Sequence, residues 1–212
     1  MRSPLAEHER GRLIEAMLPE VAFDGWSRAA LRLAARQLGM PAAEAEALFP
    51  RGAPDLVAAF SRWADRRMLD RFEAEPIGET GTAARIGRAL ELRFAVVTPW
   101  REAVRRALSV LALPPHAALG ARLIYETIDG IWYAAGDTAT DFSFYTKRAT
   151  LAAIYGAALM YWLEDRSDDF SETRAFIDRR LADVARLGEA RARFERGLER
   201  LPNPFRLLRP AR

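Results

Sequence analysis

Side chains that could carry out catalysis or hold a metal are scarce in this chain of 212 residues. It contains no cysteine, and its histidines are His8 and His116. Without cysteine there is no thiolate nucleophile, disulfide, thiolate metal site or iron–sulfur cluster. Two histidines far apart in the sequence also make a histidine-rich zinc site or a serine triad improbable. We therefore expect no catalytic residue, no metal and no cofactor, and we predict that the protein is not an enzyme.

Charge and hydropathy set the expected location. The net charge is +3, but residues 186–212 carry eight Arg and three Glu, so the basic character lies in the tail. The longest uncharged stretch, 149–163, spans about 22 Å as a helix, which is short of the roughly 30 Å core of a bilayer. Glu7, Glu9 and Glu15 make the first residues unlike an acid-poor transit peptide. We expect a bacterial cytoplasmic protein, peripheral on the inner membrane.

Apolar residues recur every three or four positions between proline and glycine breaks, which predicts an all-α protein of nine or ten helices. One predicted helix, from about Thr140 to Glu164, is apolar nearly all round. We therefore expect it to be buried on all sides, within its own subunit or between two subunits. The expected organisation is an N-terminal helix-turn-helix-like subdomain, a helical body, and a basic amphipathic helix with a tail: 1–50, 51–187 and 188–212.

The first three predicted helices have the spacing of a helix-turn-helix, with Ser27 as the cap of the second and Gly39 as its end. This arrangement resembles a tetracycline-repressor-type (TetR) regulator. A recognition helix needs donors and positive charge to meet DNA. The segment MPAAEAEALF instead offers Glu44 and Glu46 and no Arg or Lys. We expect a vestigial helix-turn-helix that does not bind nucleic acid.

The most informative stretch is IWYAAGDTATDFSFYTKRATLAAIYGAALMYWLED. Its residues 136–155 resemble the signature of the ubiquinone-biosynthesis lipid-binding family, Coq-nine, and the similarity extends from about Ala22 to the C-terminus. The resemblance implies a TetR-like fold without DNA binding and a homodimer. It also implies a pocket for an isoprenoid quinone precursor or a phospholipid, and presentation of the precursor to a membrane-associated hydroxylase of ubiquinone biosynthesis.

By resemblance, the surface that binds the hydroxylase maps onto five residues: Asp129, Ile131, Asp141, Phe144 and Tyr145. For the short polar residues Asp137, Thr138, Thr140 and Asp141, capping of the following helix is the alternative explanation. Lys147 and Arg148 fall in the first turns of that helix, where a salt bridge to Asp137 or Asp141 and contact with a lipid headgroup are both open.

For the lipid, facing helices supply eight large side chains, with small residues at Ala152, Ala153 and Gly156 that could leave space between them. The same pattern fits an ordinary filled core. The predicted lipid-binding residues are Phe94, Trp100, Leu123, Trp132, Leu151, Tyr155, Leu159 and Trp162.

The C-terminal segment alternates apolar residues and arginines at helical spacing, which predicts a basic amphipathic helix in the headgroup region of a membrane. Docking of this helix on its own protein body is the alternative. The predicted membrane-binding residues are Phe194, Leu198, Leu201, Phe205, Arg191, Arg196 and Arg200.

Together these features predict a lipid-binding accessory protein without catalytic activity that presents quinone precursors at the membrane. The alternative from another class is a ligand-sensing transcriptional regulator of the TetR type.

Overall fold

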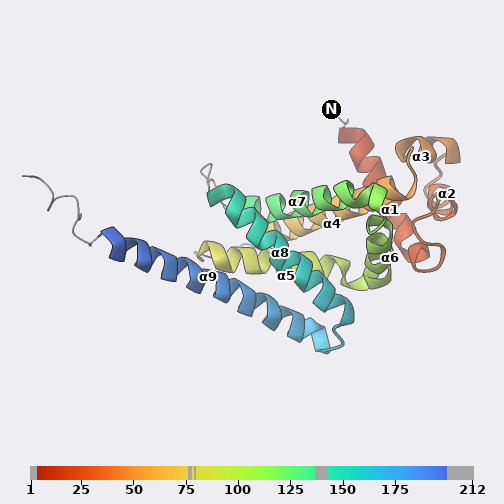
Figure 1. Ribbon diagram of the computed structural model, residues 1–212. Coiled ribbons are helices and arrows are strands. Elements are labelled where there is room, and N and C mark those ends of the chain that lie inside the picture. Colours follow the sequence, from red (N-terminus) through yellow and green to blue (C-terminus); the bar gives the residue numbers. More distant parts are fainter. Residues whose placement is uncertain (1–3, 76–77, 79, 137–142, 200–212) are drawn as a thin grey trace, which may run out of the picture.

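The computed structural model describes residues 4–75, 78, 80–136 and 143–199, and helices account for nearly all of this part (Figure 1). No strand occurs within these ranges, which confirms the all-α prediction. Short 3-10 turns lie at 98–100, 114–116 and 168–170. The α-helices are α1 (Pro4–Asp24), α2 (Arg28–Gln37), α3 (Ala42–Leu48), α4 (Ala53–Ala74), α5 (Thr82–Val97), α6 (Arg101–Leu111), α7 (Ala117–Ala134), α8 (Ser143–Glu164) and α9 (Ser171–Glu199).

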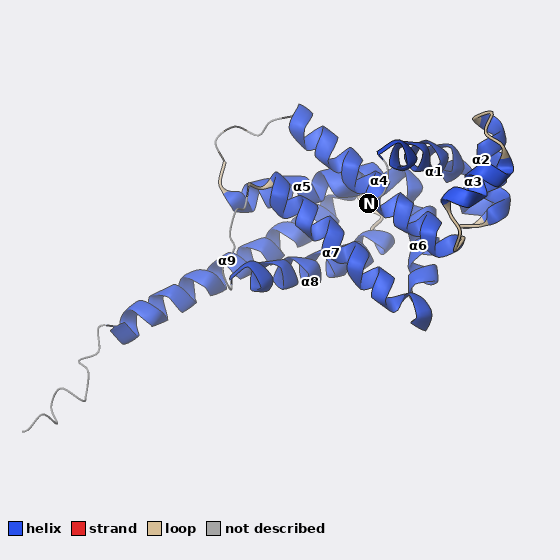
Figure 2. Cartoon of the chain, turned by 90° about the horizontal axis from the view of Figure 1, so that it is seen from above, coloured by secondary structure: helices blue, strands red, loops and turns tan. Residues whose placement is uncertain are grey.

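Helices α1, α2 and α3 form one end of the molecule and have the predicted helix-turn-helix arrangement (Figures 1 and 2). The Ser27 hydroxyl accepts a hydrogen bond from the backbone N–H of Ala30 at 3.2 Å and caps α2. Gly39 has a φ of +67°, the left-handed conformation that ends a helix. Helix α1 continues through Pro19 to Asp24, although proline disrupts the interior of a helix. Val21 is fully buried there, so core packing outweighs the local disruption by proline.

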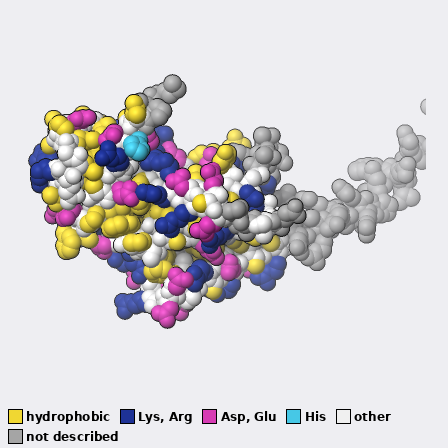
Figure 3. Space-filling model, turned by 180° about the vertical axis from the view of Figure 1, so that it is seen from behind, with side chains coloured by type: hydrophobic (Ala, Val, Ile, Leu, Met, Phe, Trp, Pro, Cys, Tyr) yellow, Lys and Arg dark blue, Asp and Glu magenta, His cyan; other side chains and the backbone are white. Residues whose placement is uncertain are grey.

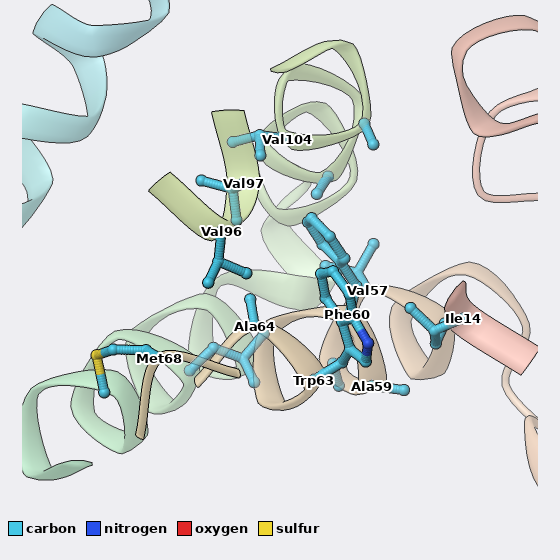
Figure 4. Close-up of a cluster of buried hydrophobic side chains, with 14 of the residues drawn as sticks. Ile14, Val57, Ala59, Phe60, Trp63, Ala64, Met68, Val96, Val97 and Val104 are labelled. Atoms are coloured by element: carbon cyan, nitrogen blue, oxygen red, sulfur yellow. The ribbon is translucent and has the colours of Figure 1, made fainter. Parts of the chain in front are cut away.

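Helix α4 is the centre of the core and contacts α1, α5, α6 and α7. Its Phe60 and Trp63 rings lie 6.0 Å apart and face the valines of the neighbouring helices in Figure 4. The Trp26 ring, 5.0 Å from Phe60, links the N-terminal helices to this core. Its indole N–H also donates to the carbonyl oxygen of Ala103 in α6 at 3.0 Å. The helix-turn-helix is thus firmly attached to the helical body.

Helix α8 is buried on one side only, which corrects the expectation of burial on all sides within one chain. Leu151, Tyr155 and Trp162 point into the core, whereas Met160 is 50% exposed and Tyr161 is 37% exposed. Its many small apolar residues made α8 look buried on all sides, but part of the helix surface is exposed to solvent. Coverage of this face by a second subunit stays a prediction.

No single helix in the described part has both the length and the apolar character needed to cross a bilayer. Thr82–Leu111 and Pro114–Ala134 meet those criteria only as a pair, and the chain bends by 101° between them.

The turn between α8 and α9 is held by the carboxylate of Asp165. It accepts hydrogen bonds from the N–H and hydroxyl of Ser167, at 2.8 and 2.6 Å, and from those of Thr173, at 2.9 and 2.5 Å. Arg101 in α6 donates to the carbonyl oxygen of Asp165 at 2.7 Å. Burial opposes the negative charge, but the Ser167 and Thr173 hydrogen bonds outweigh it and lower the pKa of Asp165 to about 2.

We expect Asp165→Asn to lower the free energy of unfolding at pH 6 by about 1–2 kcal/mol. The pKa is lower in the folded chain than its ordinary value of 3.8. The stabilisation is therefore fully present above about pH 4 and is lost as the pH falls towards 2. Urea unfolding of wild type and variant at several pH values measures the difference. Asp168→Asn, an exposed carboxylate in the same turn, is the control. A difference that stays constant down to pH 2 would contradict this role.

Candidate functional site

A largely apolar cavity of about 160 Å³ lies among α4, α5, α6, α7 and α8. Figure 4 shows part of its wall, where Val57 and Phe60 of α4 lie close to Val97 and Val104. Because five helices converge here, the shape of the cavity depends on the whole body of the fold. The lining residues are Val57, Phe60, Ser61, Arg93, Val97, Val104, Ala107, Leu108, Leu111, Gly120, Leu123, Ile124, Thr127, Tyr155 and Leu159.

Three of the eight predicted lipid-binding residues line this cavity: Leu123, Tyr155 and Leu159. The other five are not among the lining residues, and most of them are ordinary core. The Phe94 ring lies 5.7 Å from Trp162 and 5.8 Å from Tyr155, so these rings fill the space between α5 and α8. Phe94, Trp132, Leu151 and Trp162 are buried in the core, and Trp100 is partly buried. Their contact with a lipid stays a prediction.

A charged pair that was not predicted from the sequence lies at the cavity wall. Arg93 is 5% exposed, and its Nε donates to Oδ1 of Asp65 at 2.8 Å. The Thr127 hydroxyl donates to the same carboxylate, at 3.0 and 3.2 Å to its two oxygens. Arg93 and Thr127 both line the cavity, and the hydroxyl-bearing Ser61 and Tyr155 line it as well. One end of an otherwise apolar cavity is therefore polar.

Burial determines the electrostatics of this polar end. It raises the pKa of Asp65, against the lowering effect of the Arg93 charge and of the hydrogen bonds from Arg93 and Thr127. Burial also raises the pKa of the Tyr155 hydroxyl, which therefore stays protonated and able to donate. Because Arg93 and Asp65 are in direct contact, their charges largely compensate each other inside the protein.

The sequence contains a pattern that could have revealed the Arg93–Asp65 ion pair. Arg93 follows Leu90 by three residues and precedes Val97 by four, which places it on the buried stripe of its helix. Asp65 precedes Met68 by three residues and Phe72 by seven, which places it on the buried stripe of α4. A charged residue on each of two apolar stripes is the pattern of a buried ion pair.

The predicted surface for the hydroxylase is only partly formed by exposed side chains. Asp129 is exposed and accepts hydrogen bonds from Nε and Nη2 of Arg148, at 3.0 and 2.8 Å. Tyr145 is 71% exposed, and the nearby Tyr133, which was not predicted, is 75% exposed. Ile131 is fully buried, so its side chain is not part of the exposed surface, and its contact with a hydroxylase stays a prediction.

Other residues near this surface can be placed only in part. Asp141 lies outside the described residues, and Phe144 belongs to α8 without a described side chain. The Lys147 ammonium lies 5.6 Å above the Trp132 ring, which is within reach of a cation–π interaction.

The predicted membrane-binding residues lie at the end of α9 or beyond it. The helix continues through Gly188 to Glu199 and extends past the rest of the bundle (Figures 1 and 2). Arg191, Phe194, Arg196 and Leu198 belong to this part of its backbone. Arg200, Leu201 and Phe205 lie outside the described residues.

Two arginines of the helix-turn-helix are paired with one of its glutamates. Glu46 of α3 accepts hydrogen bonds from Arg28 at 3.2 Å and from Arg32 at 2.5 Å, both in α2. The hydrogen bond from Arg32 is the main reason that the pKa of Glu46 is lowered. Over the face shown in Figure 3, basic and acidic side chains alternate around an apolar area.

Comparison with known proteins relates the chain to one family. Residues 117–188 match the family model described as COQ9. The mitochondrial ubiquinone biosynthesis protein COQ9 of Homo sapiens is 32% identical over 189 residues, which are 86% of this chain and 59% of the human protein. The COQ9 protein of Drosophila melanogaster is 28% identical over 84% of this chain and 56% of its own length. The chain thus spans less than two thirds of these relatives.

The fold has a counterpart among solved structures. A TetR transcriptional regulator from Nitrosomonas europaea superposes with a TM-score of 0.65 at 22% sequence identity, covering 84% of this chain and 98% of the regulator. This match confirms the predicted TetR-like fold.

The expected location in a bacterial cytoplasm is contradicted by the relatives, which are named mitochondrial proteins of eukaryotes. The expectation relied on the acidic residues near the N-terminus, which carry no information about the compartment in which related proteins work. The predicted signature at 136–155 lies within the matched region, and the relatives match more than four fifths of the chain. On this basis the chain belongs to the COQ9 family.

Proposed function

We propose that this protein takes part in ubiquinone biosynthesis as a lipid-binding accessory protein without catalytic activity of its own. The observation that carries the proposal is the apolar cavity among α4 to α8 in a chain whose relatives are named ubiquinone biosynthesis proteins. Such a cavity shelters hydrocarbon from water, and burial of each CH₂ group contributes about 0.8 kcal/mol to affinity. Its ligand in this proposal is an isoprenoid quinone precursor, with a phospholipid as the alternative occupant.

The proposal includes delivery of this ligand to a hydroxylase at a membrane surface. The exposed Tyr133 and Tyr145 and the Asp129 carboxylate lie on α7 and α8, and exposed aromatic side chains are frequent anchors for protein partners. The arginines and apolar residues of the C-terminal segment provide the membrane contact. The exposed side of α8, which includes Met160 and Tyr161, is the face proposed to pair with a second copy.

Native mass spectrometry of the purified full chain tests the lipid proposal. We expect an isoprenoid or phospholipid to be released on activation, and we expect the protein to sediment with anionic vesicles. Gly120→Leu fills the cavity from α7 and should reduce the amount of bound lipid several-fold. The matched control is Ala121→Leu, since Ala121 is the exposed neighbour of Gly120 in α7 and does not line the cavity. A wild-type protein that releases no lipid and does not sediment with vesicles would contradict the proposal.

A TetR-type regulator is the second candidate, favoured by the helix-turn-helix geometry and by the structural match. DNA binding relies on neutralising phosphates, but Arg28 and Arg32 are already paired with Glu46 of the would-be recognition helix. We expect no shift of promoter DNA in a gel assay at low salt. A sequence-specific shift at nanomolar protein would favour the regulator instead.

A further inference from the structure

We propose that a charged groove between α1, α4 and α7 binds the phosphate group of a soluble molecule. The groove measures about 580 Å³ and shares no lining residue with the apolar cavity, so this site is separate from the proposed lipid site. Three properties lead to the proposal: an excess of positive charge, guanidinium groups that are held in place, and glycines that leave room for them. The lining residues are Glu7, Arg62, Asp65, Arg66, Leu69, Arg122, Glu126 and Gly130.

Glu126 of α7 joins two of the arginines that line the groove. Its carboxylate accepts hydrogen bonds from Nε and Nη2 of Arg62, at 2.8 and 3.2 Å, and from Nε of Arg122 at 2.8 Å. Burial opposes the charge of Glu126, but these hydrogen bonds outweigh it and lower the pKa of the carboxyl group. The bidentate contact also fixes Arg62, whose side chain is 20% exposed, so a ligand that binds this guanidinium loses little affinity to ordering it.

Glu7 of α1 is also shared by two arginines. It accepts a hydrogen bond from Nη1 of Arg66 at 2.9 Å, and it lies 3.6 Å from Nη1 of Arg10. Asp65 is paired with Arg93. Within the described residues, five arginines therefore pair with three carboxylates in this network, which leaves an excess of two positive charges.

The arginines keep N–H groups for a ligand. Nη1 of Arg62 and both Nη groups of Arg122 make no hydrogen bond to any residue that the structure describes. Asp70, one turn from Arg66 along α4, is exposed and forms no ion pair with it in the same part of the chain. The donors of Arg62 and Arg122 come from two different helices that border one groove.

Two glycines leave space where α1 and α7 border the groove. A Cβ atom at Gly11 would lie 3.3 Å from Nη2 of Arg66, so the missing side chain lets this guanidinium lie against α1. Gly130 lines the groove directly, and no side chain fills it at this position of α7. A glycine inside a helix costs roughly 1 kcal/mol relative to alanine. Both helices carry this cost beside the groove.

The charge and the donors favour a phosphate group over a carboxylate. A phosphate monoester carries nearly two negative charges at neutral pH and has three acceptor oxygens, so it can contact guanidinium groups of two helices at once. A carboxylate carries one charge in a planar group, which Glu7 and Glu126 already provide. Leu69 is the apolar side chain of the lining, so the groove has little surface for a hydrocarbon chain. This composition favours a soluble phosphate compound over a lipid headgroup.

Isothermal titration calorimetry of the full chain with inorganic phosphate at low salt tests the proposal. We expect wild type to bind, and we expect Arg122→Gln and Arg66→Gln each to bind about tenfold more weakly, since each loses a charged donor. Gly130→Leu fills the groove without a change of charge and should weaken binding at least as much. The matched control is Arg67→Gln, because Arg67 is an exposed arginine of α4 that pairs with Glu15 outside the groove. Its affinity should stay within about twofold of wild type.

Two further probes define the ligand. Acetate, the carboxylate probe, should bind more weakly than phosphate. Vesicles that contain phosphatidic acid should not displace bound phosphate, and displacement would contradict a soluble ligand. Absence of phosphate binding, equal affinity for acetate, or equal weakening by Arg67→Gln would overturn the site, provided that urea unfolding shows each variant to be folded. None of these outcomes bears on the lipid proposal, which native mass spectrometry tests separately.

Discussion

Replacement of Asp65 by alanine is expected to lower the free energy of unfolding by about 3–5 kcal/mol. The substitution leaves the Arg93 guanidinium, which is 5% exposed, without the carboxylate that compensates its charge. It also leaves the buried Thr127 hydroxyl without its acceptor. A buried charge without a partner is among the most destabilising single changes in a protein. Chemical denaturation monitored by circular dichroism at pH 7 measures the loss.

Two further variants show whether the missing partner is the cause. Asp65→Leu/Arg93→Met removes both charges, and we expect it to be much closer to wild type in stability than Asp65→Ala, because no charge is left unpaired. Glu15→Ala breaks an exposed pair with Arg67 and should cost no more than about 1 kcal/mol. If Asp65→Ala were as mild as Glu15→Ala, the pair would have no important role in stability.

The helices could be predicted from the sequence because each carries a regular apolar stripe. Leu56, Phe60, Trp63 and Met68 recur at helical spacing in the sequence, and all four are buried in α4. The boundaries were less predictable where tertiary packing competes with local preference. Helix α1 passes through Pro19 because residues beyond it, such as Val21, have a place in the core.

The cavity could be predicted only in part, because pocket and core use the same side chains. Tyr155 lines the cavity, whereas Trp162, two turns further along α8, belongs to the filled core between α5 and α8. A cavity is defined by missing atoms, and their absence depends on how five helices meet rather than on the composition of one of them. Sequence spacing could have revealed Arg93 and Asp65, since both interrupt apolar stripes.

The same periodicity explains why Ile131 is buried. It follows Thr127 by four residues and Ile128 by three, so it lies on the buried stripe of α7 together with these two residues. Asp129 lies on another side of the helix and is exposed. Assignment of a surface by resemblance must therefore be checked against the helical register of each residue.

Trp162→Ala is expected to lower the free energy of unfolding by about 3–5 kcal/mol. The Trp162 side chain is fully buried, and its ring lies 5.7 Å from Phe94 and 6.0 Å from Phe170. The Arg101 guanidinium lies 5.0 Å above the same ring and also binds the carbonyl oxygen of Asp165. The variant therefore leaves a cavity where α5, α8 and the turn before α9 meet. Thermal or urea unfolding measures the loss, with the partly exposed neighbour Tyr161→Ala as the control.

This variant also distinguishes core from lipid site. Trp162 is absent from the wall of the cavity at α4 to α8, so the fraction of chains that remain folded should carry as much lipid as wild type in native mass spectrometry. Gly120→Leu should show the opposite behaviour, with ligand binding lost and stability nearly kept, because a side chain added there meets Leu111 at an ordinary contact distance of 3.7 Å. Loss of bound lipid from folded Trp162→Ala, at a stability close to that of wild type, would instead assign Trp162 to the lipid site and require the cavity to extend towards α9.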